Sequence, residues 1–155
     1  KALEDESFGY VSKIIENSKS MLKATVNKDV KIIEEILHDI HNSEIPILQY
    51  NDENSLSCVL TLAYLSARDN YRVEREEKTG KGYADFTFHP RRKNDTAFIV
   101  ELKKDEKPEI ALKQIRSKEY VEKFKRENMG KKILAVAICY DSKEKEHHCL
   151  IEEID

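Results

Sequence analysis

A chain of 155 residues is long enough for one domain with a single buried core. Hydrophobic residues make up 39% and charged residues 37%, which indicates a globular fold with a polar surface and argues against a disordered chain. No apolar run approaches transmembrane length, and the first ten residues contain no signal-peptide core. We therefore expect a cytoplasmic protein without a membrane partner. The three cysteines include no CxxC pair and fit free thiols in a reducing compartment.

Charge is distributed unevenly along the chain, although the net charge is only -3. Residues 1–60 carry 6 basic and 11 acidic side chains, whereas residues 103–132 carry 11 basic and 6 acidic ones. A basic segment of this kind suits a polyanionic partner such as nucleic acid, and a solvated helix face is the simpler alternative.

Two amphipathic helices are predicted first, over residues 5–24 and 28–41, because apolar residues recur there at helical spacing. Asn27 is expected to cap the second helix, and residues 42–46, which end in a proline, are expected to terminate it. No polar cluster on these helices indicates a site. We interpret residues 1–50 as a helical extension that serves as scaffold or as an interaction surface.

A third helix is predicted over residues 55–69 and is apolar on most faces, which indicates a central, buried position. Glu53 lies at its first turn, where the helix dipole favours a carboxylate. Capping is one role for this residue, and a catalytic role is the alternative. Residues 71–77 alternate in polarity and predict a strand that is exposed on one face, with a turn at 78–82.

The segment from Gly82 to Lys103 predicts two strands joined by a polar loop. Alternate residues of a strand share a face, and antiparallel pairing about the centre of the loop would place Asp85 opposite Glu101. Lys103 would then join these two acids on the face opposite the apolar residues. Directly opposed like charges destabilise a sheet and are tolerated best with a cation between them, so the spacing indicates a metal site.

Hard carboxylate oxygens are the ligands that Mg²⁺ prefers, and Mn²⁺ is an alternative ion. Asp85 and Glu101 would supply two such ligands, and the backbone carbonyl of Leu102 could add a third oxygen. An ion held there would lower the pKa of a bound water and neutralise charge on a phosphate. Lys103 would orient the water or stabilise the developing charge. The residues therefore predict metal-dependent hydrolysis of a phosphodiester.

Residues 107–128 are predicted to form one helix with Pro108 in its first turn. Gln114 falls on the otherwise apolar side of this helix. It is either a core residue with hydrogen-bond partners or a group that reaches the edge of the site. Residues 131–140 form a continuous apolar run typical of a central strand, and residues 147–153 predict a closing strand.

The stretches GYADFTF, AFIVELKK and ALKQIRSKEY together resemble the PD-(D/E)XK nuclease superfamily. More closely, they resemble the nuclease-like domain at the C-terminus of bacterial proteins that begin with an AAA-ATPase-like domain. The resemblance spans about residues 51–152. It implies an α/β fold with a restriction-endonuclease-like core, a mixed sheet flanked by helices. That core would occupy residues 51–155 and follow the N-terminal helical extension at residues 1–50.

The resemblance also implies roles for individual residues. The catalytic acid and the Glu-x-Lys positions of the superfamily match Asp85, Glu101 and Lys103. The acid on the first core helix matches Glu53, and the glutamine on the helix after the Glu-x-Lys strand matches Gln114. These five residues are the expected active site.

Two positions depart from the superfamily pattern. Ala84 replaces the proline of the superfamily name, which leaves the metal ligands intact. Lys118 stands where some related nucleases carry a tyrosine, which weakens the case for a tyrosine in this site. The resemblance further implies nucleic acid, DNA rather than RNA, as the partner and Mg²⁺ or Mn²⁺ as the cofactor. It also implies an ATPase-like domain. This sequence contains no Walker motif, so that domain would belong to another part of a longer protein.

The sequence is therefore compatible with two functions. The first is a metal-dependent nuclease domain that acts on DNA. The second is a nuclease-fold module, catalytically weak or inactive, that binds or regulates an ATPase or another protein partner. In the second case the acidic N-terminal helices would face the partner, which could also be a second copy of the chain.

Overall fold

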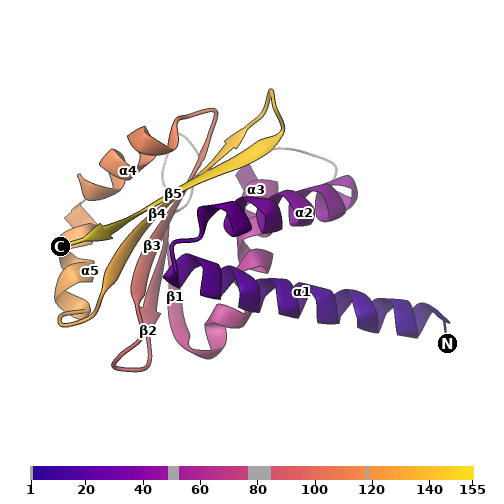
Figure 1. Cartoon of the computed structure of the whole chain (residues 1–155), viewed down its shortest axis with the longest axis horizontal. Helices are drawn as coiled ribbons and strands as arrows, with labels where there is room; N and C mark the ends of the chain where they lie inside the picture. The colour runs from indigo at the N-terminus through magenta and orange to yellow at the C-terminus, as the bar shows by residue number, and fades with distance from the viewer. Residues whose placement is uncertain (1, 49–52, 77–84, 118) are drawn as a thin grey trace.

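A five-stranded mixed sheet forms the centre of the protein, as the computed structural model shows for residues 2–48, 53–76, 85–117 and 119–155 (Figure 1). The strand order is β1-β2-β3-β4-β5. β3 and β4 are parallel, and the other neighbouring strands are antiparallel. The strands are β1 (Tyr71–Glu76), β2 (Asp85–Pro90), β3 (Ala97–Lys104), β4 (Ile133–Asp141) and β5 (Glu146–Ile154).

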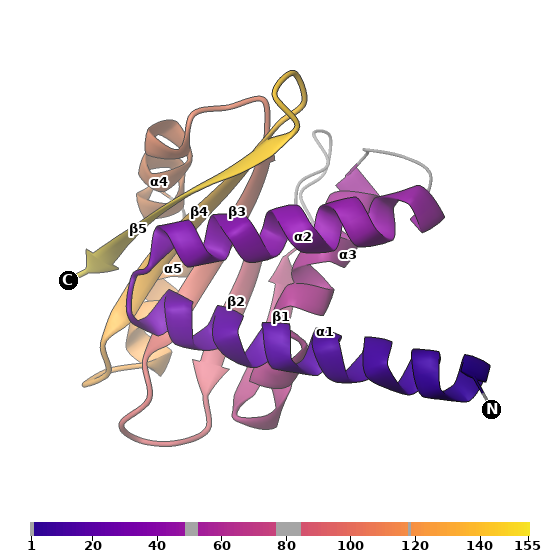
Figure 2. The ribbon, with the colours of Figure 1, turned by 45° about the vertical axis from the view of Figure 1, so that its right-hand side comes forward.

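Helices cover both faces of this sheet, which confirms the predicted α/β class with a mixed sheet flanked by helices (Figure 2). One face packs against α1 (Ala2–Val26), α2 (Val30–Leu48) and α3 (Glu53–Ala63), and α3 is followed by the short 3₁₀ helix η1 (Leu65–Asp69). The other face packs against α4 (Pro108–Arg116) and α5 (Glu119–Glu127). No helix in these ranges is long and apolar enough to span a membrane.

The first core lies between the sheet and helices α1–α3. Phe88 of β2 and Phe98 of β3 are paired in the sheet, and their rings stack with centroids 4.3 Å apart. Tyr64 packs on both rings, and its hydroxyl lies 2.9 Å from the hydroxyl of Thr25 on α1. Leu37 of α2 is fully buried in the same cluster. The two N-terminal helices therefore share a hydrophobic core with the sheet.

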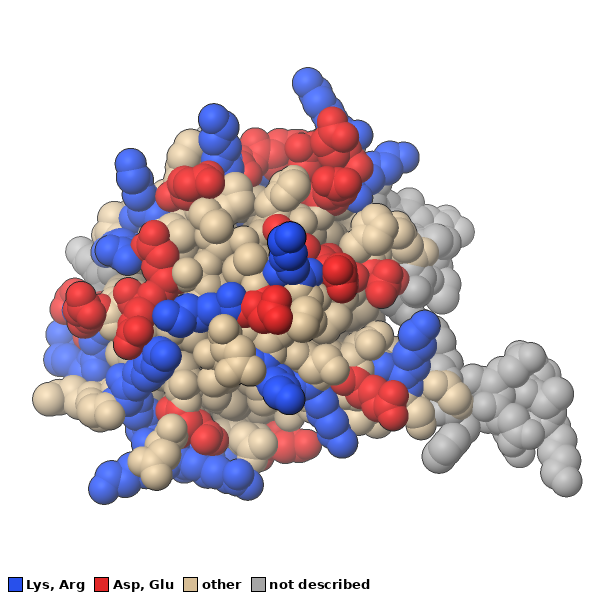
Figure 3. All heavy atoms as spheres, viewed as in Figure 1, with Lys and Arg blue, Asp and Glu red and all other residues tan. Residues whose placement is uncertain are grey.

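The second core lies beneath α4 and α5, and small residues dominate its sheet side. Ala97, Ala135 and Ala137 are fully buried there, which lets the helices approach the strands closely. Residues 133–140 of β4 are buried throughout, which confirms the predicted central strand. Acidic and basic side chains are interspersed over the outer surface of the face that Figure 3 shows.

The predicted helix over residues 107–128 is wrong, because α4 ends at Arg116 and α5 begins at Glu119. Ser117 closes α4, with its backbone N–H bonded to the carbonyls of Lys113 and Gln114 and its hydroxyl donating to the Gln114 carbonyl at 2.9 Å. A serine side chain that bonds to the backbone competes with helix continuation. The prediction of Pro108 in the first turn of α4 is confirmed.

The predicted boundaries of α2 also need correction. Asp29, not Asn27, caps this helix, because its carboxylate accepts a hydrogen bond from the Ile32 N–H at 3.4 Å. The helix continues through Pro46 to Leu48 instead of ending at residues 42–46. A proline removes one N–H from the helix and can kink it without ending it.

The predicted third helix is shorter than expected, since α3 ends at Ala63 and η1 follows. Leu56, Val59 and Leu60 are buried, whereas Cys58 is exposed. One face of α3 therefore packs into the core, and the helix is not enclosed on all sides.

Histidines gather where α2 crosses β5. The buried ring of His147 lies 4.9 Å from the ring of Tyr140 and 5.2 Å from that of His41 on α2. Burial, and after it the charges of the neighbouring His41 and His38, lower the pKa of His147 to about 3. The folded state therefore holds His147 neutral at all but strongly acidic pH.

We predict that Leu37→Ala lowers the free energy of unfolding by about 2–5 kcal/mol, because it leaves a cavity between α2 and the sheet. Ile32→Ala on the same helix, where the side chain is 41% exposed, should change it by about 0.5 kcal/mol or less. Urea unfolding followed by tyrosine fluorescence measures both. Equal midpoints for the two variants would show that α2 does not belong to the cooperative core.

We also predict that acid weakens the fold through His147. Its pKa is depressed on folding, so its contribution to stability is complete above pH 6.5 and is lost as the pH falls toward 3. Between pH 6.5 and pH 5 the loss reaches up to about 2 kcal/mol. Urea midpoints at pH 7 and pH 5 should differ less for His147→Phe than for the wild type. His148→Gln, at a half-exposed position on the same strand, is the control and should keep the wild-type difference.

Candidate active site

Strands β2 and β3 pair in the predicted register. Asp85 lies opposite Glu101, and Phe86 lies opposite Val100. Phe86 and Val100 are buried in the first core, so the alternate positions Asp85 and Glu101 lie on the other face of the sheet, toward α4 and α5. The backbone therefore brings the two predicted acids to adjacent positions on one face.

Glu101 is fully buried, with 0% of its surface exposed. Its Oε1 lies 3.6 Å from the Nζ of Lys103, whose side chain is 15% exposed. Removing a carboxylate from water costs several kcal/mol unless opposite charge compensates for the loss. The Lys103 ammonium provides part of this compensation. A divalent cation between Glu101 and Asp85 would provide more, so the donor chemistry at these positions fits a hard metal ion.

The neighbouring strand β4 forms one wall of the site. Glu101 lies beside Ala137, whose small side chain leaves space for the carboxylate, and Lys103 lies beside Cys139. Cys139 is 1% exposed. This burial, and after it the charges of Glu106 and Glu101, raise the pKa of its thiol to about 12, whereas Lys103 opposes the rise. Charged side chains of β3 and of the connection to α4 therefore lie near enough to this buried thiol to shift its pKa.

Gln114 of α4 lies at the rim of this site. Its Nε2 donates a hydrogen bond to Glu106 Oε1 at 3.2 Å, and both side chains are half-buried. The charge of Glu106, like that of Glu101, contributes to the raised pKa of the Cys139 thiol. Sequence reasoning missed Glu106, because it lies in the connection before α4 and follows no helical or strand period. The glutamine thus has a polar partner, and the charge of that partner acts on the Cys139 thiol beside Lys103.

Glu53 and Asp85 are described in the structure by their backbone and not by their side chains. Glu53 begins α3, one turn before Ser57, and the Ser57 hydroxyl accepts a hydrogen bond from Arg75 of β1 at 3.3 Å. Arg75 adjoins Glu76, which pairs with Asp85. The start of α3 therefore lies near the start of β2. However, α3 packs on the face of the sheet opposite to Glu101.

The backbone carbonyl oxygen of Leu102 was expected to be a third metal ligand. Its side chain is buried in the first core, and the described pairing of β2 with β3 ends one residue earlier, at Glu101. Among the side chains that the structure describes, no three Asp, Glu, His or Cys groups converge closely enough to hold a metal ion. The predicted ligand pair includes Asp85, whose side chain lies outside that set.

An open cavity of about 500 Å³ lies at the carboxyl ends of the parallel strands β3 and β4, where α4 begins. Glu106, Lys107 and His148 are among the residues that line it. Its wall is held by Asp105, whose carboxylate accepts hydrogen bonds from the N–H and the hydroxyl of Ser142 at 2.8 Å. These bonds lower the pKa of Asp105. Crevices beyond the carboxyl ends of parallel strands are common ligand sites.

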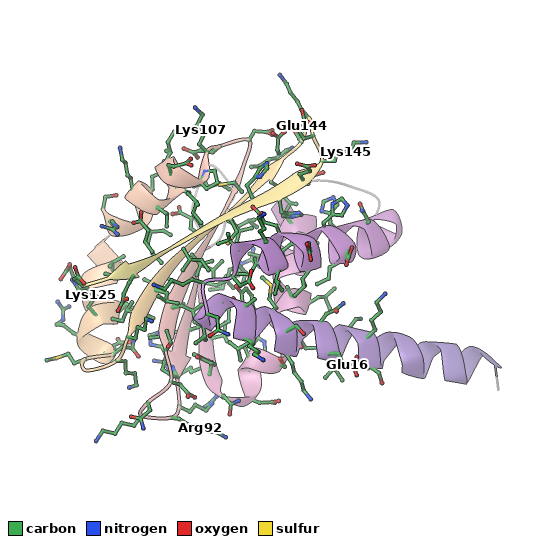
Figure 4. All side chains as sticks on the ribbon, viewed as in Figure 1. Glu16, Arg92, Lys107, Lys125, Glu144 and Lys145 are labelled. Atoms are coloured by element: carbon green, nitrogen blue, oxygen red, sulfur yellow. The ribbon has the colours of Figure 1, made fainter. Side chains whose placement is uncertain are left out.

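The side chains at this end reach into solvent from two elements. In Figure 4, Lys107 extends from the start of α4, and Glu144 and Lys145 extend from the turn between β4 and β5. Lys107 and Lys143 border the cavity itself, so its rim carries cationic groups that can contact a phosphate chain.

Comparison with models of protein families gives a match to the PD-(D/E)XK nuclease superfamily over residues 51–148. Comparison with curated proteins gives no match. The matched segment begins just before α3 and ends within β5, so it contains all five expected site residues and leaves α1 and α2 outside. Because this match covers more than half of the chain and the sheet and helices have the expected arrangement, the chain belongs to the PD-(D/E)XK nuclease superfamily.

Proposed function

We propose that this chain is a Mg²⁺- or Mn²⁺-dependent nuclease that hydrolyses phosphodiester bonds in DNA. The observation that carries the proposal is the pairing of Asp85 opposite the buried Glu101, with Lys103 Nζ 3.6 Å from the Glu101 carboxylate. Membership of the PD-(D/E)XK superfamily supports nuclease chemistry and a divalent metal. RNA is the less favoured substrate.

Each residue has a distinct role in this proposal. Asp85 and Glu101 hold the ion, with the Leu102 carbonyl as a further oxygen. When bound, the ion activates water and offsets the charge that develops on the phosphate. Lys103, held by its contact with Glu101, orients the attacking water or stabilises that charge.

Glu53 and Gln114 support the site in this proposal. The amide of Gln114 is already oriented by Glu106, so it can present its carbonyl oxygen toward the site while its nitrogen donates to the carboxylate. Glu53 would act from the start of α3, past the end of β2, because its helix packs on the opposite face of the sheet.

We place the nuclease-like domain at residues 51–155 and regard residues 1–50 as a helical extension that packs on it. An AAA-ATPase-like domain would complete a longer cytoplasmic protein. A second candidate function is binding or regulation of such an ATPase, or of another protein partner, by a catalytically weak or inactive domain. The full burial of Glu101 favours this alternative, because a carboxylate closed off from solvent is poorly placed to meet a phosphate.

We predict that Glu101→Gln lowers Mg²⁺-dependent cleavage of plasmid and linear DNA by about 100-fold or more, because the neutral amide cannot hold the ion. The substitution keeps the size of the side chain, and circular dichroism checks that the variant is folded. Glu109→Gln on the exposed first turn of α4 is the matched control and should cleave like the wild type. Equal nicking by the wild type and Glu101→Gln would exclude Glu101-dependent catalysis.

We predict a different effect for Lys103→Met, because the lysine acts on water and charge and not as a ligand. This variant should lose about 100-fold in kcat and still bind Mn²⁺ in a calorimetric titration, whereas Glu101→Gln should lose the binding itself. If the wild type binds no divalent metal and cleaves neither DNA nor RNA, the alternative of a binding or regulatory module replaces the nuclease proposal.

A further inference from the structure

Two loops and the end of a helix lie together at the end of the sheet opposite the candidate site. The turn at residues 91–96 joins β2 to β3, and residues 128–132 join α5 to β4. The Ala97 N–H, at the start of β3, donates a hydrogen bond to the Lys132 carbonyl at 2.9 Å, which holds the two loops side by side. Segments that are about 35 residues apart in the sequence therefore form one surface.

Six cationic side chains lie on these segments and make no ion pair within the described part of the chain. All are exposed except Lys131, which is half-exposed. They are Arg91, Arg92, Lys93, Arg126, Lys131 and Lys132, and we refer to them as the basic end. Figure 3 shows Lys and Arg gathering at this lower left end, and Figure 4 shows Arg92 extending away from the fold.

Acidic neighbours only partly offset this charge. Asp95 lies in the same turn, and Asp155 follows Ile154, which pairs with the residue after Lys132. Glu127 of α5 already lies within 4 Å of Arg72 and Lys123. The six cations of the basic end therefore leave an excess of positive charge in solvent, although the whole chain is net negative at -3.

We propose that the basic end binds the phosphate backbone of nucleic acid, as a contact region separate from the cleavage site. The class of partner rests on the proposed function. Exposed cations without ion pairs lose no such interaction when they bind a phosphate. Each phosphate that they neutralise releases counterions from the nucleic acid. Contacts of this kind position a duplex without reading its sequence.

The length of β3 sets the shortest duplex that could contact both the basic end and the candidate site. From Ala97 at the basic end to Lys103 at the candidate site, β3 spans six residue steps, or about 20 Å at about 3.3 Å per residue. A duplex advances about 3.4 Å per base pair, so about six base pairs separate the two contact regions. Duplexes longer than this can engage both regions, and shorter ones can engage only one.

An anionic membrane is the other polyanion that such a surface could meet. Met129 lies in the loop between Arg126 and Lys131 and is 80% exposed. One methionine provides little apolar area for insertion, and membrane binding strength scales with that area. The shared sheet also links the basic end to a nuclease site, which favours nucleic acid.

The test compares two variants that lose the same charge. The first carries Arg92→Gln, Lys93→Gln, Lys131→Gln and Lys132→Gln. The control removes four exposed lysines from α1 and α2 that also make no described ion pair, at Lys13, Lys19, Lys23 and Lys31. Fluorescence anisotropy measures binding of a 20-base-pair duplex in EDTA, between 50 and 200 mM salt, so that no cleavage intervenes.

We expect the basic-end variant to bind at least about tenfold more weakly at low salt, with a salt slope reduced by about 3 to 4. The control should keep the wild-type slope and lie within about threefold of its affinity. Equal affinities and slopes for the two variants on the long duplex would overturn the proposal, as would binding to phosphatidylserine vesicles in place of DNA.

This result is separable from the outcome for the nuclease proposal. If cleavage does not depend on Glu101 but the basic-end variant loses DNA binding, the nuclease proposal fails and the basic end stands as a nucleic-acid surface. If cleavage depends on Glu101 and the basic-end variant binds DNA like the wild type, the inference about the basic end fails alone.

Discussion

The antiparallel pairing of β2 with β3 is the interaction on which both the core and the site depend. Its register directs Phe86 and Val100 into the first core and assigns Asp85 and Glu101 to the opposite face. A shift by one residue would reverse every side chain and place carboxylates among the aromatic rings. The stack of Phe88 on Phe98 opposes such a shift, so aromatic packing on one face maintains the position of the acids on the other.

The second core creates the environment that makes Glu101 chemically unusual. Alanines on β4 let α4 lie close to the sheet, and this close packing buries the carboxylate along with the apolar residues around it. Charge in such a place is stabilised only by nearby opposite charge, which Lys103 supplies at 3.6 Å. The same packing brings Gln114 and Glu106 to the rim. Structural packing and the proposed chemistry are therefore inseparable in this half of the molecule.

The features that could be predicted from sequence are those set by the two-residue period of strands. The opposed pair Asp85 and Glu101 and the buried strand β4 follow from alternation and from a continuous apolar run. The break after Arg116 was missed because apolar periodicity does not record a serine hydroxyl that bonds back to the helix backbone. Glu106 and the joining of Arg91–Lys93 to Lys131–Lys132 were missed because they depend on how loops fold back, which no periodic pattern records.

The parallel pairing of β3 with β4 has a consequence for the order in which the protein assembles. Asp85 and Glu101 are 16 positions apart in the chain, whereas Ala97 and its β4 partner Ile133 are 36 apart. Closing the longer loop costs more entropy, and α4 and α5 must be placed before the second core can form. The hairpin with the opposed acids is thus the more local unit. Its strands have to pair despite the repulsion between the Asp85 and Glu101 carboxylates, while Glu101 is still in water. Solvent screening at that stage makes assembly of a buried carboxylate feasible, because the charge is enclosed only when β4 arrives.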